Sequence, residues 1–164
     1  MITIAIIIFG YFIISLLGYF IHWSFHQKWT GQFHNSHMVH HLELYPPTDY
    51  MSDKYRYAGK DNTTKLFIIL AIPLVILLIS LMFFKIISLK ILIILLLELL
   101  IIGGLNNYMH DSFHINNHWL GKIPFIKTWF NNLNNLHYRH HIEMEFNYGI
   151  FAFHFDKLFK TFKR

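Results

Sequence analysis

Three long apolar runs limit what this chain can fold into. Ile2 to Ile21 contains no charged residue, nor does Leu66 to Phe84, and Ile86 to Leu105 is interrupted only by Lys90 and Glu98. At a rise of about 1.5 Å per residue, a helix of roughly 20 residues crosses the ~30 Å hydrocarbon core of a bilayer. We therefore expect three membrane-spanning helices, with the second and third joined as a tight hairpin.

The composition favours a membrane protein over a soluble domain. Hydrophobic residues make up 54% of the 164 and charged residues only 14%, whereas ordinary soluble domains are about 25% charged. A cleaved signal peptide is the alternative for the first run, but the run is too long and no Lys or Arg precedes it. The length predicts one domain, residues 1–164. The absence of cysteine excludes disulfides, thiolate metal sites and cysteine nucleophiles.

The positive charges predict the topology. Of the 14 Lys and Arg residues, 12 lie in two polar segments, 22–65 and 106–164. A hairpin between these segments places both on the same side of the membrane, and the positive-inside rule makes that side cytoplasmic. Aromatic residues are interleaved with the charges in both segments, which predicts a compact helical cap on the bilayer. The expected fold is thus an all-α integral membrane bundle, in a bacterial inner membrane or the endoplasmic reticulum, with no basic stripe for nucleic acid.

Histidines are the second strong feature of the chain. There are 13 of them against 9 carboxylates, and all lie in the two polar segments. Ten form four clusters whose spacings, i and i+4 or i, i+3 and i+4, place their members on one face of a helix. The two clusters before the hairpin have the same spacings as the two after it. The ten are His22, His26, His37, His40, His41, His110, His114, His137, His140 and His141.

So many neutral imidazoles at adjoining helix ends need binding partners. Each ring nitrogen left unpaired in a buried site costs roughly 1 to 3 kcal/mol, and metal coordination would remove that cost. Ten ligands are too many for one ion, which takes about four to six. The sequence therefore predicts a site in which the ten histidines bind two metal ions. The alternative is that they are polar residues at the membrane boundary, as each would be taken singly; His34, His118 and His154 stay outside the predicted set.

Several carboxylates are candidates for supporting roles. Asp111, Glu143, Glu145 and Asp156 lie near the clusters in sequence, where each either accepts a hydrogen bond from an imidazole or is simply solvated. Glu98 lies near the middle of the third run, where an ionisable group is costly. It is either a neutral acid that bonds another helix or a group near a polar part of the substrate.

The four histidine boxes resemble those of the membrane di-iron fatty acid hydroxylase superfamily, which includes sterol desaturases and carotenoid hydroxylases. The resemblance extends to the stretch from His40 to Tyr50, to Asn147-Tyr-Gly-Ile and to Phe155-Asp-Lys-Leu-Phe. It implies two iron ions held by the boxes, with zinc possible after purification, and oxidation of a lipid C–H bond by dioxygen to an alcohol or alkene. Such a bond offers neither an acidic proton nor an electrophile, so a redox metal is required.

The resemblance leaves the substrate open. We favour a fatty-acyl or related lipid, with sterol desaturase and carotenoid hydroxylase activity as alternatives; in carotenoid hydroxylases the first and third boxes usually have one more intervening residue. Many relatives have four spans where we count three. No cytochrome or flavin motif is fused here, so electrons would come from a separate donor, such as a cytochrome or a ferredoxin with its reductase.

Two functions of other classes compete with the oxygenase. A non-catalytic membrane metal-binding or transport protein would favour ionisable or polar residues through the spans, and Glu98 and Lys90 are the main ones there. A haem-binding bundle is disfavoured because haem requires isolated axial histidines within the spans.

Overall fold

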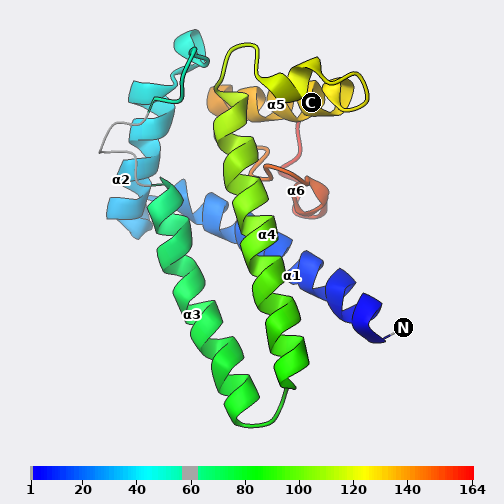
Figure 1. Ribbon diagram of the computed structural model, residues 1–164. Coiled ribbons are helices and arrows are strands. Elements are labelled where there is room, and N and C mark those ends of the chain that lie inside the picture. The colour runs from blue at the N-terminus through cyan, green and yellow to red at the C-terminus, as the bar shows by residue number, and fades with distance from the viewer. Residues whose placement is uncertain (1, 57–62) are drawn as a thin grey trace.

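The computed structural model describes residues 2–56 and 63–164, and the fold is helical in both ranges. Three long helices, α1 (Ile2–Phe25), α3 (Thr63–Phe83) and α4 (Leu89–Phe113), carry the apolar runs. Figure 1 shows α3 and α4 as an antiparallel hairpin, with α1 crossing α4 and the shorter helices lying toward the end opposite the hairpin turn. Within the described ranges, β structure is confined to an isolated bridge between Ser52 and Ile115, so the predicted all-α fold is confirmed.

Two helices are long and apolar enough to cross a bilayer, Thr3–Phe25 and Leu89–Phe113, and the apolar part of α3 within the described chain is shorter, Ala71–Phe83. Their large side chains project outward: Phe9 is 67% and Leu100 72% exposed. A core helix of a soluble protein would bury such residues, so these surfaces fit contact with lipid. Crossing of the bilayer by α1 and α4, and by α3 as the third predicted span, stays a prediction.

The ends of the long helices carry histidines into the cap. Helix α1 continues past Ile21 to Phe25 and thereby holds His22, and α4 continues past Leu105 to Phe113 and holds His110. The hairpin turn ends at Ser88, whose hydroxyl accepts from the N–H of Ile91 at the start of α4. This N-cap satisfies one of the free amides of the first turn.

The second helix changes its winding within the second histidine box. Gly31 has φ +60°, a left-handed conformation that suits glycine, and it separates α1 from α2 (Gln32–Val39). A π-helical turn, η2 (His40–Leu44), follows α2, and its last bond runs from the N–H of Tyr45 to the carbonyl of His40. The predicted helix thus continues to Leu44, but with a wider turn that is common at functional sites.

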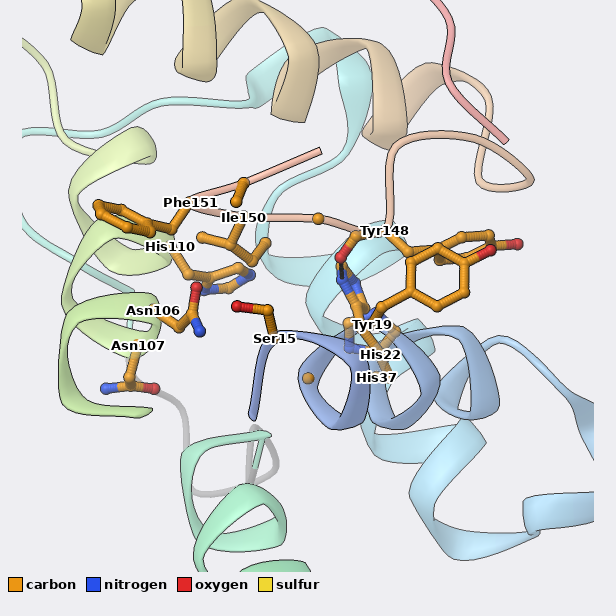
Figure 2. Close-up of a pocket in the computed structure, with 13 residues that line it drawn as sticks. Ser15, Tyr19, His22, His37, Asn106, Asn107, His110, Tyr148, Ile150 and Phe151 are labelled. Carbon is orange, nitrogen blue, oxygen red and sulfur yellow. Dashed lines mark hydrogen bonds between the residues drawn. The ribbon is translucent and has the colours of Figure 1, made fainter. Parts of the chain in front are cut away.

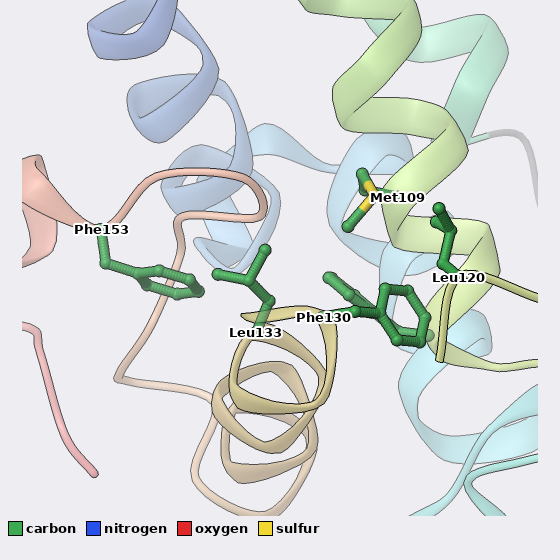
Figure 3. Close-up of a cluster of buried hydrophobic side chains, with 6 residues drawn as sticks. Met109, Leu120, Phe130, Leu133 and Phe153 are labelled. Carbon is green, nitrogen blue, oxygen red and sulfur yellow. The ribbon is translucent and has the colours of Figure 1, made fainter. Parts of the chain in front are cut away.

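A small hydrophobic core fixes the remaining helices on the end of α4. Figure 3 shows Met109 of α4 near Leu120 of η4 (Trp119–Lys122), while Leu133 of α5 (Lys127–Ile142) lies toward Phe153, which precedes α6 (His154–Leu158). Because α5 packs here, its histidines face those at the end of α4. The core consists of Met109, Phe113, Leu120, Phe130, Leu133 and Phe153.

Helices α1 and α4 run in the same direction and meet in a constant register. A Cβ on Gly10 would overlap the carboxyl group of Glu98, and a Cβ on Gly18 would lie 3.9 Å from Nδ2 of Asn106. Both carboxyl oxygens of Glu98 are buried, and in the described chain neither has a hydrogen-bond partner. Glu98 therefore occupies space that the missing side chain of Gly10 leaves open.

Candidate metal centre

Nine of the ten predicted histidines converge in two adjacent groups. Within each group the ligand nitrogens lie within 4.8 Å of one another, and nearly all the side chains are buried. The groups touch each other, since the ring centroids of His41 and His141 are 4.1 Å apart. The first group is His22, His26, His37, His41 and His140, and the second is His40, His114, His137 and His141.

The sequence recurrence is also a spatial one. In the second box the outer pair, His37 and His41, belongs to the first group, while His40 belongs to the second. In the fourth box the assignment is reversed: the outer pair belongs to the second group, and His140 crosses to the first. Each three-histidine box therefore bridges the two groups, which ties the two predicted ion sites to one another.

His110 lies beside the second group without belonging to it. Its ring centroid is 4.7 Å from that of His40 and 4.8 Å from that of His137, and its buried Nε2 lacks a hydrogen-bond partner in the described chain. His110 opens the third box as His22 opens the first. Its predicted role as a ligand, which would give each group five histidines, stays a prediction.

Backbone carbonyls orient four of the histidines. The Nδ1 atoms of His22, His114, His140 and His141 lie 2.6, 3.0, 2.6 and 2.8 Å from the carbonyl oxygens of Tyr148, Tyr50, Phe146 and Tyr45, respectively. A carbonyl accepts only, so Nδ1 carries the proton and Nε2 holds the free lone pair. This fixes the tautomer that a metal requires. Three of the accepting carbonyls, those of Tyr45, Tyr50 and Tyr148, belong to stretches that resemble the family, and the sequence gives no other sign of them.

The inward-facing nitrogens fit a metal ion. Nε2 of His22, of His140 and of His141 is buried and lacks a hydrogen-bond partner in the described chain. Elsewhere ring nitrogens point at each other, with Nε2 of His37 2.9 Å from Nε2 of His26 and 3.0 Å from Nε2 of His41. A cation bound between such lone pairs would satisfy them together, whereas two neutral rings share one proton at most.

Burial favours the ligand form of these side chains. Desolvation lowers the pKa of His37, His41 and His137 well below the ordinary value of 6.5, and neighbouring histidines lower it further. The same direction and leading cause hold for His26, His114, His140 and His141. Neutral imidazoles are the species that bind metals, so the folded chain presents these ligands without first removing protons.

Asp156 supports the site through the backbone. Its buried carboxylate accepts from the N–H of Tyr148 at 2.7 Å, from the N–H of Gly149 at 2.9 Å and from the hydroxyl of Thr161 at 3.0 Å. Burial raises the pKa of Asp156 to about 6, against the effect of these hydrogen bonds. The carboxylate thus holds the segment whose Tyr148 carbonyl orients His22.

Arg56 holds the stretch after the second box. Its guanidinium donates to the carbonyl of Leu44 at 2.6 Å and pairs with the Asp49 carboxylate at 2.7 Å. The same cation lies over the ring of Tyr45, 5.4 Å from its centroid. Tyr45 in turn stacks on His114, with centroids 4.0 Å apart. The stretch from His40 to Tyr50 therefore supplies both ligands and the groups that position them.

The other predicted carboxylates have mixed roles. Asp111 lies 3.2 Å from Nδ1 of His110, as a supporting acceptor would. Glu143 instead pairs with Arg139 and Lys163, away from the histidines. No histidine contact of Glu145 is found in the described chain.

None of the three histidines left out of the prediction joins either group: His34 bonds the carbonyl of Phe25, His118 caps η4, and His154 packs on Tyr11 and Phe12.

A cavity lies beside the histidines, between α1 and α4. Ser15, Gly18 and His22 of α1 form one wall and Asn106, Asn107 and His110 of α4 the opposite wall, while residues 148–152 close the third side. His37 reaches the cavity from α2 (Figure 2). The volume of the cavity is about 50 Å³. Since a pocket for a whole drug-sized ligand takes roughly 300 to 1,000 Å³, only part of a lipid fits here.

Comparison with known proteins gives one family. The model of the family described as fatty acid hydroxylase matches residues 7–161, which is nearly the whole chain and includes all four histidine boxes. No curated protein and no solved structure matches the chain.

Proposed function

Because this chain belongs to the fatty acid hydroxylase family, we propose that it is a membrane-bound di-iron oxygenase that hydroxylates or desaturates a lipid. The observation that carries the proposal is the pair of buried histidine groups at the end of a cavity between two apolar helices. Family membership implies a metal-dependent oxidoreductase in general terms. We further propose that the substrate is a lipid, that the metal is iron and that the oxidant is dioxygen.

The ten box histidines would hold two iron ions, five for each ion if His110 joins the second group. Bound there, the ions would supply the redox chemistry with dioxygen that an unactivated C–H bond requires. For a hydroxylation, one oxygen atom of O2 enters the lipid and the other leaves as water, with two electrons and two protons from a separate donor. Histidine ligands suit iron, although zinc binds such sites as well or better by affinity order.

The chain's own residues would bind and shield the substrate. The tail would lie along α1 and α4, whose exposed surfaces are apolar, and its reacting segment would enter the cavity beside His22 and His110. The positive charges of the polar segments favour a cytoplasmic position of the cap. A soluble or membrane-bound electron donor would then reach the cap from the cytoplasm.

The test is incorporation of labelled oxygen into lipid. Membranes containing the protein and a reducing system are supplied with ¹⁸O2, and lipid extracts are analysed by mass spectrometry for a mass gain of one labelled oxygen. The variants H37A and H141A remove one ligand from each group, while H34A alters a histidine of α2 that lies outside both groups.

We expect the label in lipids of the wild type and of H34A and its loss in both ligand variants. Labelled lipid at wild-type levels in H37A and H141A would contradict the assignment. Bound metal with no labelled lipid under any reductant would favour the non-catalytic metal-binding function instead.

A further inference from the structure

Two polar side chains face the cavity without using their hydrogen-bonding groups. In the described chain neither the hydroxyl of Ser15 nor the carboxamide of Asn106 makes a hydrogen bond. Figure 2 shows the Ser15 hydroxyl turned toward Asn106 and His110. Both residues are half-buried on the facing walls formed by α1 and α4.

Other helical serines of this chain behave differently. The hydroxyls of Ser24, Ser80 and Ser112 donate to backbone carbonyls one turn earlier, at 2.7, 2.8 and 2.6 Å. That bond is the usual way for a serine to satisfy its hydroxyl in a membrane helix. Ser15 leaves it unmade, so its hydroxyl is free to bond whatever fills the cavity.

The position of the pair matches the polar end of a lipid. The apolar run of α4 ends at Leu105, so Asn106 stands where the hydrocarbon gives way to polar head groups. It precedes His110 by one helical turn, roughly 6 Å along the axis. The remaining walls are largely apolar, with Ile150, Phe151 and Ala152 on the third side. The cavity thus offers a few hydrogen bonds within an apolar space, the usual composition of a small-molecule site.

We propose that Ser15 and Asn106 bind the polar group of the lipid substrate and so determine which lipids the enzyme accepts. This inference rests on the proposed function. A hydroxyl, ester or amide suits them, because a serine hydroxyl and a carboxamide each offer a donor and an acceptor. The oxidised carbon then lies within a few bonds of that polar group, since the histidines begin one turn away. Chains oxidised at mid-length or at the far end do not fit this arrangement.

The test measures binding and so does not depend on turnover. The metal-loaded protein in detergent is labelled with a photoreactive hexadecanol that carries a diazirine in its chain, and labelling of α1 and α4 is read by peptide mass spectrometry. Competitors are 1-hexadecanol and n-heptadecane at equal mole fraction in the detergent, which differ by a hydroxyl in place of a methyl group. The variants are S15A and N106L, with S80A as the matched control in α3.

In the wild type and S80A we expect the alcohol to compete about tenfold better than the alkane, as one or two hydrogen bonds predict. In S15A and N106L that ratio falls to within about twofold, while labelling itself persists. A wild-type ratio near one would mean that water or apolar chain occupies the cavity, and an unchanged ratio in both variants would place the polar group elsewhere. Either result overturns the inference.

The two proposals fail in different ways. If ¹⁸O enters lipids but the competition ratio does not respond to S15A and N106L, the oxygenase stands and the specificity site is wrong. If no lipid is oxidised but the ratio responds as expected, the polar-lipid site stands and the oxygenase is wrong.

Discussion

The Nδ1 atom of His22 donates a hydrogen bond to the carbonyl oxygen of Tyr148 over 2.6 Å, joining α1 to a segment 126 positions later in the chain. This bond turns the Nε2 lone pair of His22 toward the first histidine group. The Tyr148 carbonyl is held in turn by the Asp156 carboxylate, which accepts from the N–H groups of Tyr148 and Gly149. A metal ligand at one end of the chain therefore depends on a carboxylate near the other end.

The first prediction concerns this carboxylate. D156N keeps the shape of the side chain but presents an NH2 group to one of the two backbone N–H groups, so the segment carrying Tyr148 loses an acceptor. We expect metal affinity to fall about 10- to 100-fold, the usual effect of losing a group that orients a ligand. Competition with a chelator measures it.

The control for D156N is D53N. Asp53 is exposed, its carboxylate accepts from Nδ2 of Asn116 at 3.2 Å, and it bonds neither a histidine nor the Tyr148 segment in the described chain. D53N should bind metal as the wild type does. Unchanged metal affinity in folded D156N would show that the Tyr148 segment does not depend on Asp156.

The second prediction concerns acid. Seven box histidines outside the long apolar helices, six of them buried and His26 half-buried, have folded pKa values well below 6.5, chiefly because of desolvation. Below pH 6.5 the unfolded chain takes up protons that the folded chain does not, so stability falls as pH decreases. Each such group contributes up to about 1.4 kcal/mol per pH unit. Asp156, whose pKa of about 6 is raised, acts in the opposite direction, but it is one group against seven.

Denaturant unfolding of the metal-free protein in detergent, followed between pH 8 and pH 5, measures the effect. The free energy of unfolding should be nearly constant above pH 7 and should fall steeply below 6.5. The fall should be shallower in H37Q, which removes one of the seven groups. A stability that rises between pH 6.5 and pH 5 would contradict the burial of these side chains as neutral imidazoles.

The third prediction concerns the contact between α1 and α4. G10L would drive a side chain into the space of the Glu98 carboxyl group, and such overpacking typically costs about 1 to 3 kcal/mol. G103L is the matched control, because a Cβ on Gly103 of α4 meets no other atom within 4 Å. Thermal unfolding in detergent should show a lower midpoint for G10L than for G103L. Equal midpoints would mean that α1 does not pack on α4 at Gly10.

Much of this arrangement could be predicted from residue spacing. The i, i+4 spacing of His22 and His26 predicts that the two rings converge, and they do so in the first group, with His22 in the last turn of α1 and His26 just past the helix end. The division of the second box was not predictable in the same way. It depends on where the other boxes lie in the fold, and the fourth box, on the regular helix α5, divides between the two groups in the same way.

The supporting groups were harder to identify. Sequence proximity suggested side-chain carboxylates as partners of the imidazoles, and this is seen for Asp111 with His110. For His114 and His141 the partners are the backbone carbonyls of Tyr50 and Tyr45. Every residue has a carbonyl, so only the fold decides which one faces a ligand. The role of Asp156 could not be predicted either, because its carboxylate accepts from two backbone N–H groups and from no histidine.

The most direct test of the account is metal content. Protein expressed in medium enriched in ⁵⁷Fe is purified in detergent, and its total metal and Mössbauer spectrum are measured for the wild type, H37A, H141A and the control H34A. The account predicts about two irons per chain in the wild type and H34A, and about one or fewer in each ligand variant. Well-folded wild-type protein that binds no metal would contradict it, since the two histidine groups would then have no ion to satisfy them.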